Sequence, residues 1–483
     1  MKSDNQLKQR SIIGFIWKLF EKAGTQIVAM IVQILLARLL LPEDYGIIGY
    51  LVVFITLSDV FIKQGFTTAL IQKKDADKLD MSSVFYANIG LSILLYAVFY
   101  FTAPFIAEFY KEPRLTSIMR VLCLNVIIGA TSAVHDAIMS KNLEFKKSFV
   151  RSLSNTITNG IVGIILAFSG FGVWSLVYSR LAGVMAGAIV LWITVKWHPT
   201  FEFSFTRIKS LFKYSSKVLG TNLLNTLFNN INPLIIGKFH SSAALGYYQR
   251  GQNIPHTIMN TVDGSMSEVM YPTFSKLQSD LDALKSALRR SMKLSTYIVF
   301  PSLMGLLAVS RPLTLFLLTE KWLPSVPYMQ LTCIICLFWP LTARTHALNA
   351  IGKSELTFKL SLISRAISLV CLIISARFGV MAIMYGSIVA STINFFISTH
   401  FINKLLNYSY KELATDILPQ LALSIVMCVI ILGIGMLDLN NVLLLFIQVP
   451  TGIVVYILGS MLFKIESYSY VLNMLKKFLK RKV

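Results

Sequence analysis

Residues 18–49 read KLFEKAGTQIVAMIVQILLARLLLPEDYGIIG, and residues 213–249 repeat the pattern as KYSSKVLGTNLLNTLFNNINPLIIGKFHSSAALGYYQ. Both segments contain two lysines four residues apart, then a Gly-Thr-amide triplet, then a cation and a glycine. Each segment opens a block of six apolar stretches. An even number of membrane helices per repeat gives both copies the same orientation, so they are related by an axis along the membrane normal. The repeat therefore predicts two like-oriented six-helix bundles around a central cavity, an arrangement typical of transporters.

The composition places the chain among membrane proteins. Of its 483 residues, 55% are hydrophobic and only 14% are charged, whereas a soluble domain has about 25% charged residues. The apolar residues form long stretches, and about 20 such residues cross the bilayer core as a helix. We therefore expect an all-α integral membrane protein with about fourteen transmembrane helices.

The apolar stretches also predict how the chain is divided. We expect an N-terminal six-helix bundle in residues 1–196, a cytoplasmic linker at 197–210 and a C-terminal six-helix bundle at 211–410. Residues 411–483 are expected to form two additional helices and a basic cytoplasmic tail. The expected helices lie at about 12–40, 46–70, 82–107, 115–139, 148–169, 173–196, 211–239, 245–274, 288–310, 325–350, 355–377, 380–405, 416–437 and 441–463.

The formal net charge of +22 comes mainly from lysine and arginine in alternate loops. Lys73 and Lys146 lie in one set of loops, whereas the opposite loops contain only scattered cations such as Lys111 and Lys238. Cytoplasmic loops of membrane proteins are enriched in lysine and arginine. This pattern predicts a multi-pass protein with both termini in the cytoplasm. The cations then face anionic lipid headgroups, and we expect no nucleic-acid partner.

The five cysteines give no sign of a metal or redox site. All lie in apolar stretches, and the Cys333–Cys336 pair has no second pair or neighbouring histidine in the sequence. Cysteines in such surroundings behave as small buried hydrophobic residues. We expect no bound metal.

Two runs in matching places of the repeats resemble a known family. They are ARLLLPEDYGIIGYLVVFITLSDVFIKQGFTTALIQ (37–72) and LFKYSSKVLGTNLLNTLFNNINPLIIGKFHSSAALGYYQRGQNIP (211–255). They resemble the polysaccharide transporter family, which includes the Wzx-type flippases. It belongs to a superfamily that also contains multidrug exporters and the flippase for the lipid-linked peptidoglycan precursor. The resemblance covers roughly residues 10–410.

The resemblance implies a transporter of the bacterial inner membrane. Such proteins move undecaprenyl-pyrophosphate-linked oligosaccharides to the periplasmic leaflet for O-antigen, capsule or exopolysaccharide assembly. It implies alternating access of a cationic central cavity, with the lipid bilayer and other polysaccharide assembly proteins as partners. These transporters are not ATPases, and this sequence contains no GxxxxGK[ST] loop to hold a triphosphate.

Cations at membrane depth are the first candidates for substrate contact. Ionisable side chains inside a bilayer are costly and usually functional, and guanidinium groups pair well with phosphate oxygens. The lysines have an alternative role, because both lie early in their helices and could reach the cytoplasmic interface. The arginines could instead form structural ion pairs. The predicted substrate-binding residues are Lys22, Arg180, Lys217, Arg250 and Arg365.

Three acidic residues in the predicted helices are candidates for coupling transport to Na⁺ or H⁺: Asp59, Asp263 and Glu268. Asp59 lies four residues before Lys63, so the two could equally form a neutral ion pair on one helix face. No other cofactor is expected.

Three other functions compete with the flippase. A multidrug exporter fits the superfamily, although a cationic cavity is unsuited to cationic drugs. A membrane polymerase or glycosyltransferase would use the DxD motifs at 75–77 and 280–282, but these lie in short loops without a nucleotide-binding domain. A non-transporting scaffold is the third. The Gly183–Gly187 GxxxG motif predicts close helix packing.

Overall fold

The computed structural model describes residues 24–470 and residue 472. This part of the chain consists of helices and connecting turns, with no β-strand among the described residues. The chain divides into two compact units, Met1–Gly246 and Tyr247–Val483. The prediction of an all-helical protein is therefore confirmed.

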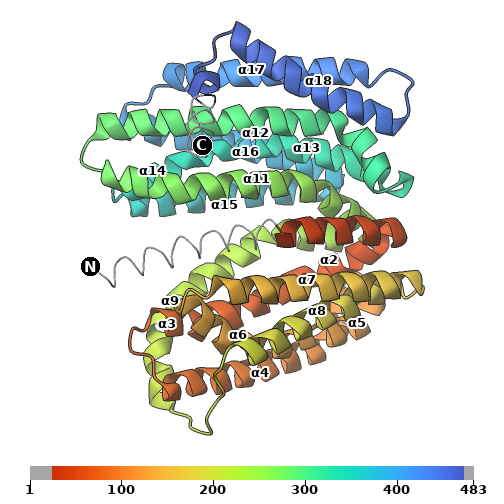
Figure 1. Cartoon of the computed structure of the whole chain (residues 1–483), viewed down its shortest axis with the longest axis vertical. Helices are drawn as coiled ribbons and strands as arrows, with labels where there is room; N and C mark the ends of the chain where they lie inside the picture. Colours follow the sequence, from red (N-terminus) through yellow and green to blue (C-terminus); the bar gives the residue numbers. More distant parts are fainter. Residues whose placement is uncertain (1–23, 471, 473–483) are drawn as a thin grey trace, which may run out of the picture. The chain divides into compact units, whose positions relative to one another are not determined.

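The first unit begins with the helix Gly24–Leu39 (Figure 1). It continues with α2 (Pro42–Gln64), α3 (Phe66–Gln72), α4 (Lys78–Tyr110), α5 (Arg114–Leu122), α6 (Leu124–Lys141), α7 (Phe145–Phe168), α8 (Val173–Thr194), α9 (Phe205–Asn229) and α10 (Ile231–Phe239). The first turn of α11 (Ser242–Lys276) also belongs to this unit.

The second unit contains the rest of α11 and all later helices. These are α12 (Leu281–Leu317), η1 (Glu320–Ser325), α13 (Val326–Cys336), η2 (Trp339–Thr342), α14 (Ala343–Ala350), α15 (Ser354–Ser375), η3 (Ala376–Phe378), α16 (Val380–Leu406), α17 (Tyr410–Ile434) and α18 (Asn441–Leu462).

Ten helical segments of the described chain are long and apolar enough to cross a membrane. The protein is therefore a multi-pass membrane protein. Four of the predicted membrane helices are not among the ten: the one expected at 12–40, of which the structure describes Gly24–Leu39, and those that are now α7, α9 and α11. Each has polar residues within its length. The count of fourteen transmembrane helices stays a prediction.

The chain after α8 packs back onto the first unit. The backbone N–H groups of Thr200 and Ser204 each donate a 3.0 Å hydrogen bond, to the hydroxyls of Ser82 and Ser83 near the start of α4. Helix α9 then contacts α2, α3 and α4. The first compact unit consequently extends to Gly246. The predicted bundle limits at 196 and 211 divide the chain by its internal sequence repeat and not by contacts. They stay a prediction.

Two glycines at matching places of the repeats pack against each other's helix starts. A Cβ atom placed on Gly46 of α2 would lie 1.8 Å from the backbone oxygen of Ser242. A Cβ placed on Gly246 would lie 2.1 Å from the backbone oxygen of Pro42. The two helix starts therefore approach so closely that only glycine fits at either position. This reciprocal contact gives a physical reason for the glycine in each repeat.

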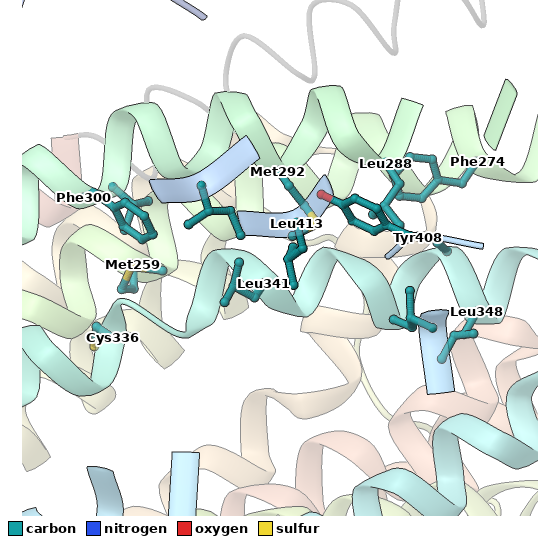
Figure 2. Packing of buried hydrophobic residues seen from close by; sticks show 14 of the residues in the cluster. Met259, Phe274, Leu288, Met292, Phe300, Cys336, Leu341, Leu348, Tyr408 and Leu413 are labelled. Atoms are coloured by element: carbon teal, nitrogen blue, oxygen red, sulfur yellow. The ribbon is translucent and has the colours of Figure 1, made fainter. Parts of the chain in front are cut away.

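Buried apolar side chains from α11, α12, α13, α14, α16 and α17 form the main core of the second unit. Figure 2 shows Met292 of α12 close to Leu413 of α17 and to Tyr408. Transfer of such a side chain from water into a protein core contributes about 1.5–3 kcal/mol. This contribution applies to side chains that would otherwise contact water and not lipid.

An ion-pair network joins α12 to α17 in this core. Arg289 of α12 donates hydrogen bonds of 2.7 and 2.9 Å to the two carboxylate oxygens of Asp416, which is 2% exposed. The Tyr408 hydroxyl donates to the same carboxylate at 2.8 Å. Lys293 lies 3.2 Å from Asp416 and 2.6 Å from Glu466, which follows α18. The network therefore fixes the C-terminal helices to α12.

The predicted helix at 325–350 is broken in the middle. Helix α13 ends at Cys336, the short η2 contains Pro340, and α14 resumes at Ala343. Proline has no N–H group to continue the helical hydrogen bonds. Arg344, 3% exposed, donates a 2.8 Å hydrogen bond to the Leu341 carbonyl and another to the Thr399 hydroxyl. The guanidinium thus replaces bonds that the break removes.

Candidate functional site

The first unit contains a cavity of about 440 Å³ between α2, α6, α7, α8 and the helix Gly24–Leu39. This volume lies in the range of small-molecule sites in proteins. Its polar or charged lining residues are Gln33, Tyr45, Asp59, Lys63, Asn125, Ser132, Arg151, Asn155, Thr156, Asn159, Ser179 and Arg180. Polar groups at this density are unusual in membrane helices, where they mark substrate or ion pathways.

The cavity wall has more positive than negative charge. Lys63, Arg151 and Arg180 line it, with Asp59 as the carboxylate among the described lining residues. Lys63 pairs with Asp59 at 3.0 Å, and Arg151 pairs at 3.0 Å with Asp136, which lies behind the wall. The cavity therefore favours an anionic ligand.

Arg180 is the cation whose charge is least compensated. It lies on α8 within a membrane-spanning segment and is half-buried. Asp59 attracts it electrostatically, but Arg180 forms no hydrogen bond or ion pair with any described residue. A guanidinium in such a position can form two parallel hydrogen bonds with a phosphate.

Helix α7 places its polar side chains by their spacing. Arg151, Asn155 and Asn159 are four residues apart, so they lie on one helix face with a rise of about 6 Å between neighbours. This face lines the cavity. Helices α7 and α8 run side by side (Figure 1) and are in extensive contact. Gly183 and Gly187 of α8 face the α7 residues, which lets the two helices approach closely.

The structure distributes the predicted cationic residues over several environments. Arg180 lines the cavity, and Lys217 lies exposed on α9. In the second unit, Arg250 is 8% exposed, with its guanidinium 5.6 Å from the Trp322 ring, and Arg365 is half-buried on α15. Lys22 lies outside the described residues. Of the four that the structure describes, only Arg180 lies on the cavity wall described above.

The predicted coupling residues also separate. Asp59 lines the cavity and forms the ion pair with Lys63 that the four-residue spacing allows. Asp263 and Glu268 belong to α11, but the structure does not describe their side chains. The structure therefore brings Asp59 and Arg180 into one site. The roles of all eight candidates stay predictions.

Both DxD motifs have a structural role. The Asp77 carboxylate accepts a 2.7 Å hydrogen bond from the Asp80 backbone N–H at the start of α4. This bond and the nearby Arg207 lower the pKa of Asp77. Asp280 accepts a 2.9 Å bond from the Ala283 N–H at the start of α12. Aspartate is a preferred helix cap, which accounts for one aspartate of each motif without a nucleotide sugar.

Sequence reasoning overlooked four residues of the site. Arg151 is not among the predicted site residues, and the sequence does not show that it pairs with Asp136. Asn125, Asn155 and Asn159 are neutral and do not stand out in a search for charges. The run SNTITN at 154–159, polar within a predicted membrane helix, is the signal that could have revealed α7 as a cavity wall.

Comparison with known proteins identifies relatives along most of the chain. The Bacillus subtilis (strain 168) teichuronic acid biosynthesis protein TuaB is 25% identical over 78% of this chain and 79% of its own. The succinoglycan biosynthesis transport protein ExoT of Rhizobium meliloti (strain 1021) is 24% identical over 84% and 80%. The lipopolysaccharide biosynthesis protein WzxC of Escherichia coli (strain K12) is 20% identical over 88% and 89%.

Solved structures show the same fold. The lipid II flippase MurJ in an inward closed conformation matches with a TM-score of 0.75 at 18% identity, over 94% of this chain and 98% of MurJ. An inward-facing multidrug resistance MATE transporter matches with a TM-score of 0.64 at 14% identity, over 80% and 96%. The fold is therefore that of MurJ and the MATE transporters.

The family assignment rests on a direct match of the sequence. The model of the family described as "Polysaccharide biosynthesis protein" matches residues 35–327, which is more than half of the chain. The chain belongs to the polysaccharide biosynthesis protein family and is a multi-pass membrane protein.

Proposed function

We propose that this protein flips undecaprenyl-pyrophosphate-linked oligosaccharides across the bacterial inner membrane. The family and the relatives named for teichuronic acid, succinoglycan and lipopolysaccharide biosynthesis support this class of substrate. The MurJ-like fold supports the reaction type, because MurJ is a lipid II flippase. The product would be an O-antigen, capsule or exopolysaccharide unit.

Arg180 is the observation that carries the proposal. A diphosphate is the part of the substrate that hydrocarbon excludes most strongly, because burying an unpaired charge is very costly. Arg180 places a guanidinium on a polar cavity wall at a membrane-spanning helix, and no described residue forms an ion pair with it. The diphosphate would bind there, with Lys63 adding a second positive charge.

Asp59 is the proposed link to an ion gradient. Its carboxylate forms an ion pair with Lys63 at 3.0 Å and also attracts Arg180 electrostatically. A bound diphosphate would compete for both cations and leave Asp59 to take a proton or Na⁺. Release of that ion would restore the pairs and expel the lipid. Alternating opening of the cavity to the two membrane faces, and cytoplasmic termini, belong to this proposal.

Export of small drugs is the competing function, because the fold also matches a MATE transporter. The cationic excess of the cavity argues against the cationic compounds that such a transporter would have to bind. Export of an anionic or neutral small molecule would have to be tested separately, because a measurement of lipids does not detect it.

The test is to deplete the protein in its host, extract the lipids, and measure the amount and sidedness of undecaprenyl-linked oligosaccharide. Accumulation of single units on the cytoplasmic face supports the proposal and identifies the substrate by its mass. Accumulation on the periplasmic face would place the protein at a later assembly step. An unchanged lipid pool in a strain that makes the polymer would overturn the flippase function.

A further inference from the structure

The cavity wall contains three amide side chains that the diphosphate does not explain. Asn125 lies on α6, and Asn155 and Asn159 lie on α7. A phosphate offers only hydrogen-bond acceptors at neutral pH, and its charge is met by Arg180 and Lys63. The amide nitrogens could donate to such a phosphate, but the amide oxygens need a donor that it does not have.

The described structure gives these amides no structural role. Asn125 is 5% exposed, and its Oδ1 atom is buried without a hydrogen-bond partner among the described residues. The side chains of Asn155 and Asn159 likewise form no hydrogen bond within the described part of the chain. The Asn125 oxygen is itself closed off from the cavity, whereas the amides of Asn155 and Asn159 line it without a hydrogen-bond partner in the described chain. Polar groups away from water are almost always hydrogen-bonded in native proteins, so these two amides indicate a ligand that can bond them.

The chemistry of the open atoms selects the ligand class. An amide oxygen needs a donor, and the amide nitrogen needs an acceptor. A hydroxyl group provides both, whereas a phosphate cannot donate to the amide oxygens of Asn155 and Asn159. An ammonium group could donate, but the cationic excess of this cavity disfavours it. Neutral sugar hydroxyls therefore suit the amides of Asn155 and Asn159.

The packing of α7 against α8 holds the amides in place. A Cβ on Gly183 would lie 3.0 Å from Asn155 Oδ1 and 3.0 Å from Asn159 Cβ. A Cβ on Gly187 would lie 3.5 Å from Asn155 Nδ2. Asn155 and Asn159 are therefore seated against α8 one helical turn apart. A site whose side chains are held in this way is preorganised for its ligand.

We propose that Asn155 and Asn159, which line the cavity together with Asn125, form a subsite for the neutral sugar that adjoins the diphosphate. The inference rests on the proposed function and adds that the protein recognises the sugar part of the lipid. Arg180 binds the anionic part common to all such lipids, and the amides distinguish a lipid that bears sugar from one that does not. The cavity of about 440 Å³ accommodates part of a head group at a time.

The experiment measures binding of two lipids to the purified full-length protein in detergent: undecaprenyl diphosphate, and the same lipid bearing the host's oligosaccharide. We expect Asn155→Ala and Asn159→Ala to weaken binding of the sugar-bearing lipid by about three- to tenfold, the value of one hydrogen bond. Binding of undecaprenyl diphosphate should stay within about twofold of wild type. Arg180→Gln should weaken binding of both lipids.

Thr158→Val is the matched control, because Thr158 lies on α7 but is not among the residues that line the cavity. It should leave binding of both lipids unchanged. Asn125→Ala is tested in the same way if its melting temperature equals that of wild type. If it does not, the test uses the two α7 variants alone.

The outcomes separate the two proposals. Equal affinity of wild type and both α7 variants for the sugar-bearing lipid would overturn the sugar subsite and leave the flippase function intact. Loss of affinity for both lipids in the α7 variants would also overturn it, because the amides would then not distinguish sugar. Failure of wild type to bind either lipid would overturn the proposed function itself.

Discussion

Asn155 on α7 packs directly against Gly183 on α8, so that a Cβ on the glycine would lie 2.9 Å from the Asn155 backbone oxygen. The GxxxG motif predicts close packing of membrane helices from the sequence, and this contact shows what the packing positions. The face of α7 that meets the two glycines is the face that lines the cavity. Helix packing and the polar cavity wall therefore depend on the same contact.

Gly183→Ala should destabilise the protein and weaken substrate binding. The added methyl group meets backbone and the Asn159 Cβ atom, neither of which can move without shifting α7. Overpacking of this kind costs about 1–3 kcal/mol. Thermal unfolding in detergent and binding of the sugar-bearing lipid would both report the change.

Gly187→Ala is the matched control for this effect. Its methyl group would be in ordinary contact, 3.5 Å from Asn155 Cβ, and alanine is about 1 kcal/mol better than glycine in a helix interior. The melting temperature should stay the same or rise. Equal loss in both variants would mean that the Gly183 contact does not position α7.

Asp59→Asn should strengthen lipid binding and slow transport. The carboxylate competes with the diphosphate for Lys63 and Arg180. Asp59 and Lys63 are partly exposed, so removing the competition should raise affinity for undecaprenyl diphosphate only about two- to fivefold. Transport should fall, because no carboxylate restores the cation pairs. Lys63→Gln should lower the same affinity, and unchanged binding in both variants would contradict competition at this site.

Gly46→Ala and Gly246→Ala should each prevent normal folding of the first unit. Each methyl group would lie within about 2 Å of a backbone oxygen, 1.8 Å from Ser242 and 2.1 Å from Pro42. We expect a loss of about 3 kcal/mol and a lower yield of folded protein in the membrane. Gly90→Ala serves as control, because no atom lies within 4 Å of a Cβ at Gly90. Normal yield and melting temperature in either repeat variant would refute the close approach.

Asp416→Ala should lower the stability of the second unit by about 3 kcal/mol, because it leaves Arg289 and Lys293 without their buried partner. Glu466→Ala removes a carboxylate that is 78% exposed, and it should change stability by less than about 1 kcal/mol. Thermal unfolding of the two variants gives the comparison. Similar melting temperatures would show that the network contributes little to stability.

The ten membrane-spanning segments of the described chain could be predicted from sequence because each is a long apolar stretch. The expected helices at 355–377 and 380–405 are close to α15 (Ser354–Ser375) and α16 (Val380–Leu406). The break near Pro340 has a signal in the sequence, because proline interrupts helical hydrogen bonds, whereas the break at Gly65 has none. The helix expected at 46–70 is divided at Gly65. The sequence does not predict this break, because the apolar composition continues across it and contains no information on backbone angles.

The site could be predicted only where a charge stood out. Arg180 and Asp59 were recognised because ionisable residues in membrane helices are rare. Their presence in one cavity depends on how α2 and α8 pack, which neither sequence segment reveals. The Arg151–Asp136 pair joins α7 to α6, and the role of Asn125 depends on the absence of a partner in the described fold. These are tertiary relationships and required the structure.

The most direct test of the central claim is flipping by the purified protein. The full-length protein would be reconstituted in liposomes containing the lipid-linked oligosaccharide isolated from depleted cells, and the appearance of sugar at the outer surface would be followed with a membrane-impermeant reagent. We predict flipping well above that of empty liposomes by wild type, and its loss in Arg180→Gln with the protein still folded. Flipping no faster than in empty liposomes, or undiminished flipping by Arg180→Gln, would contradict transport through the Arg180 cavity.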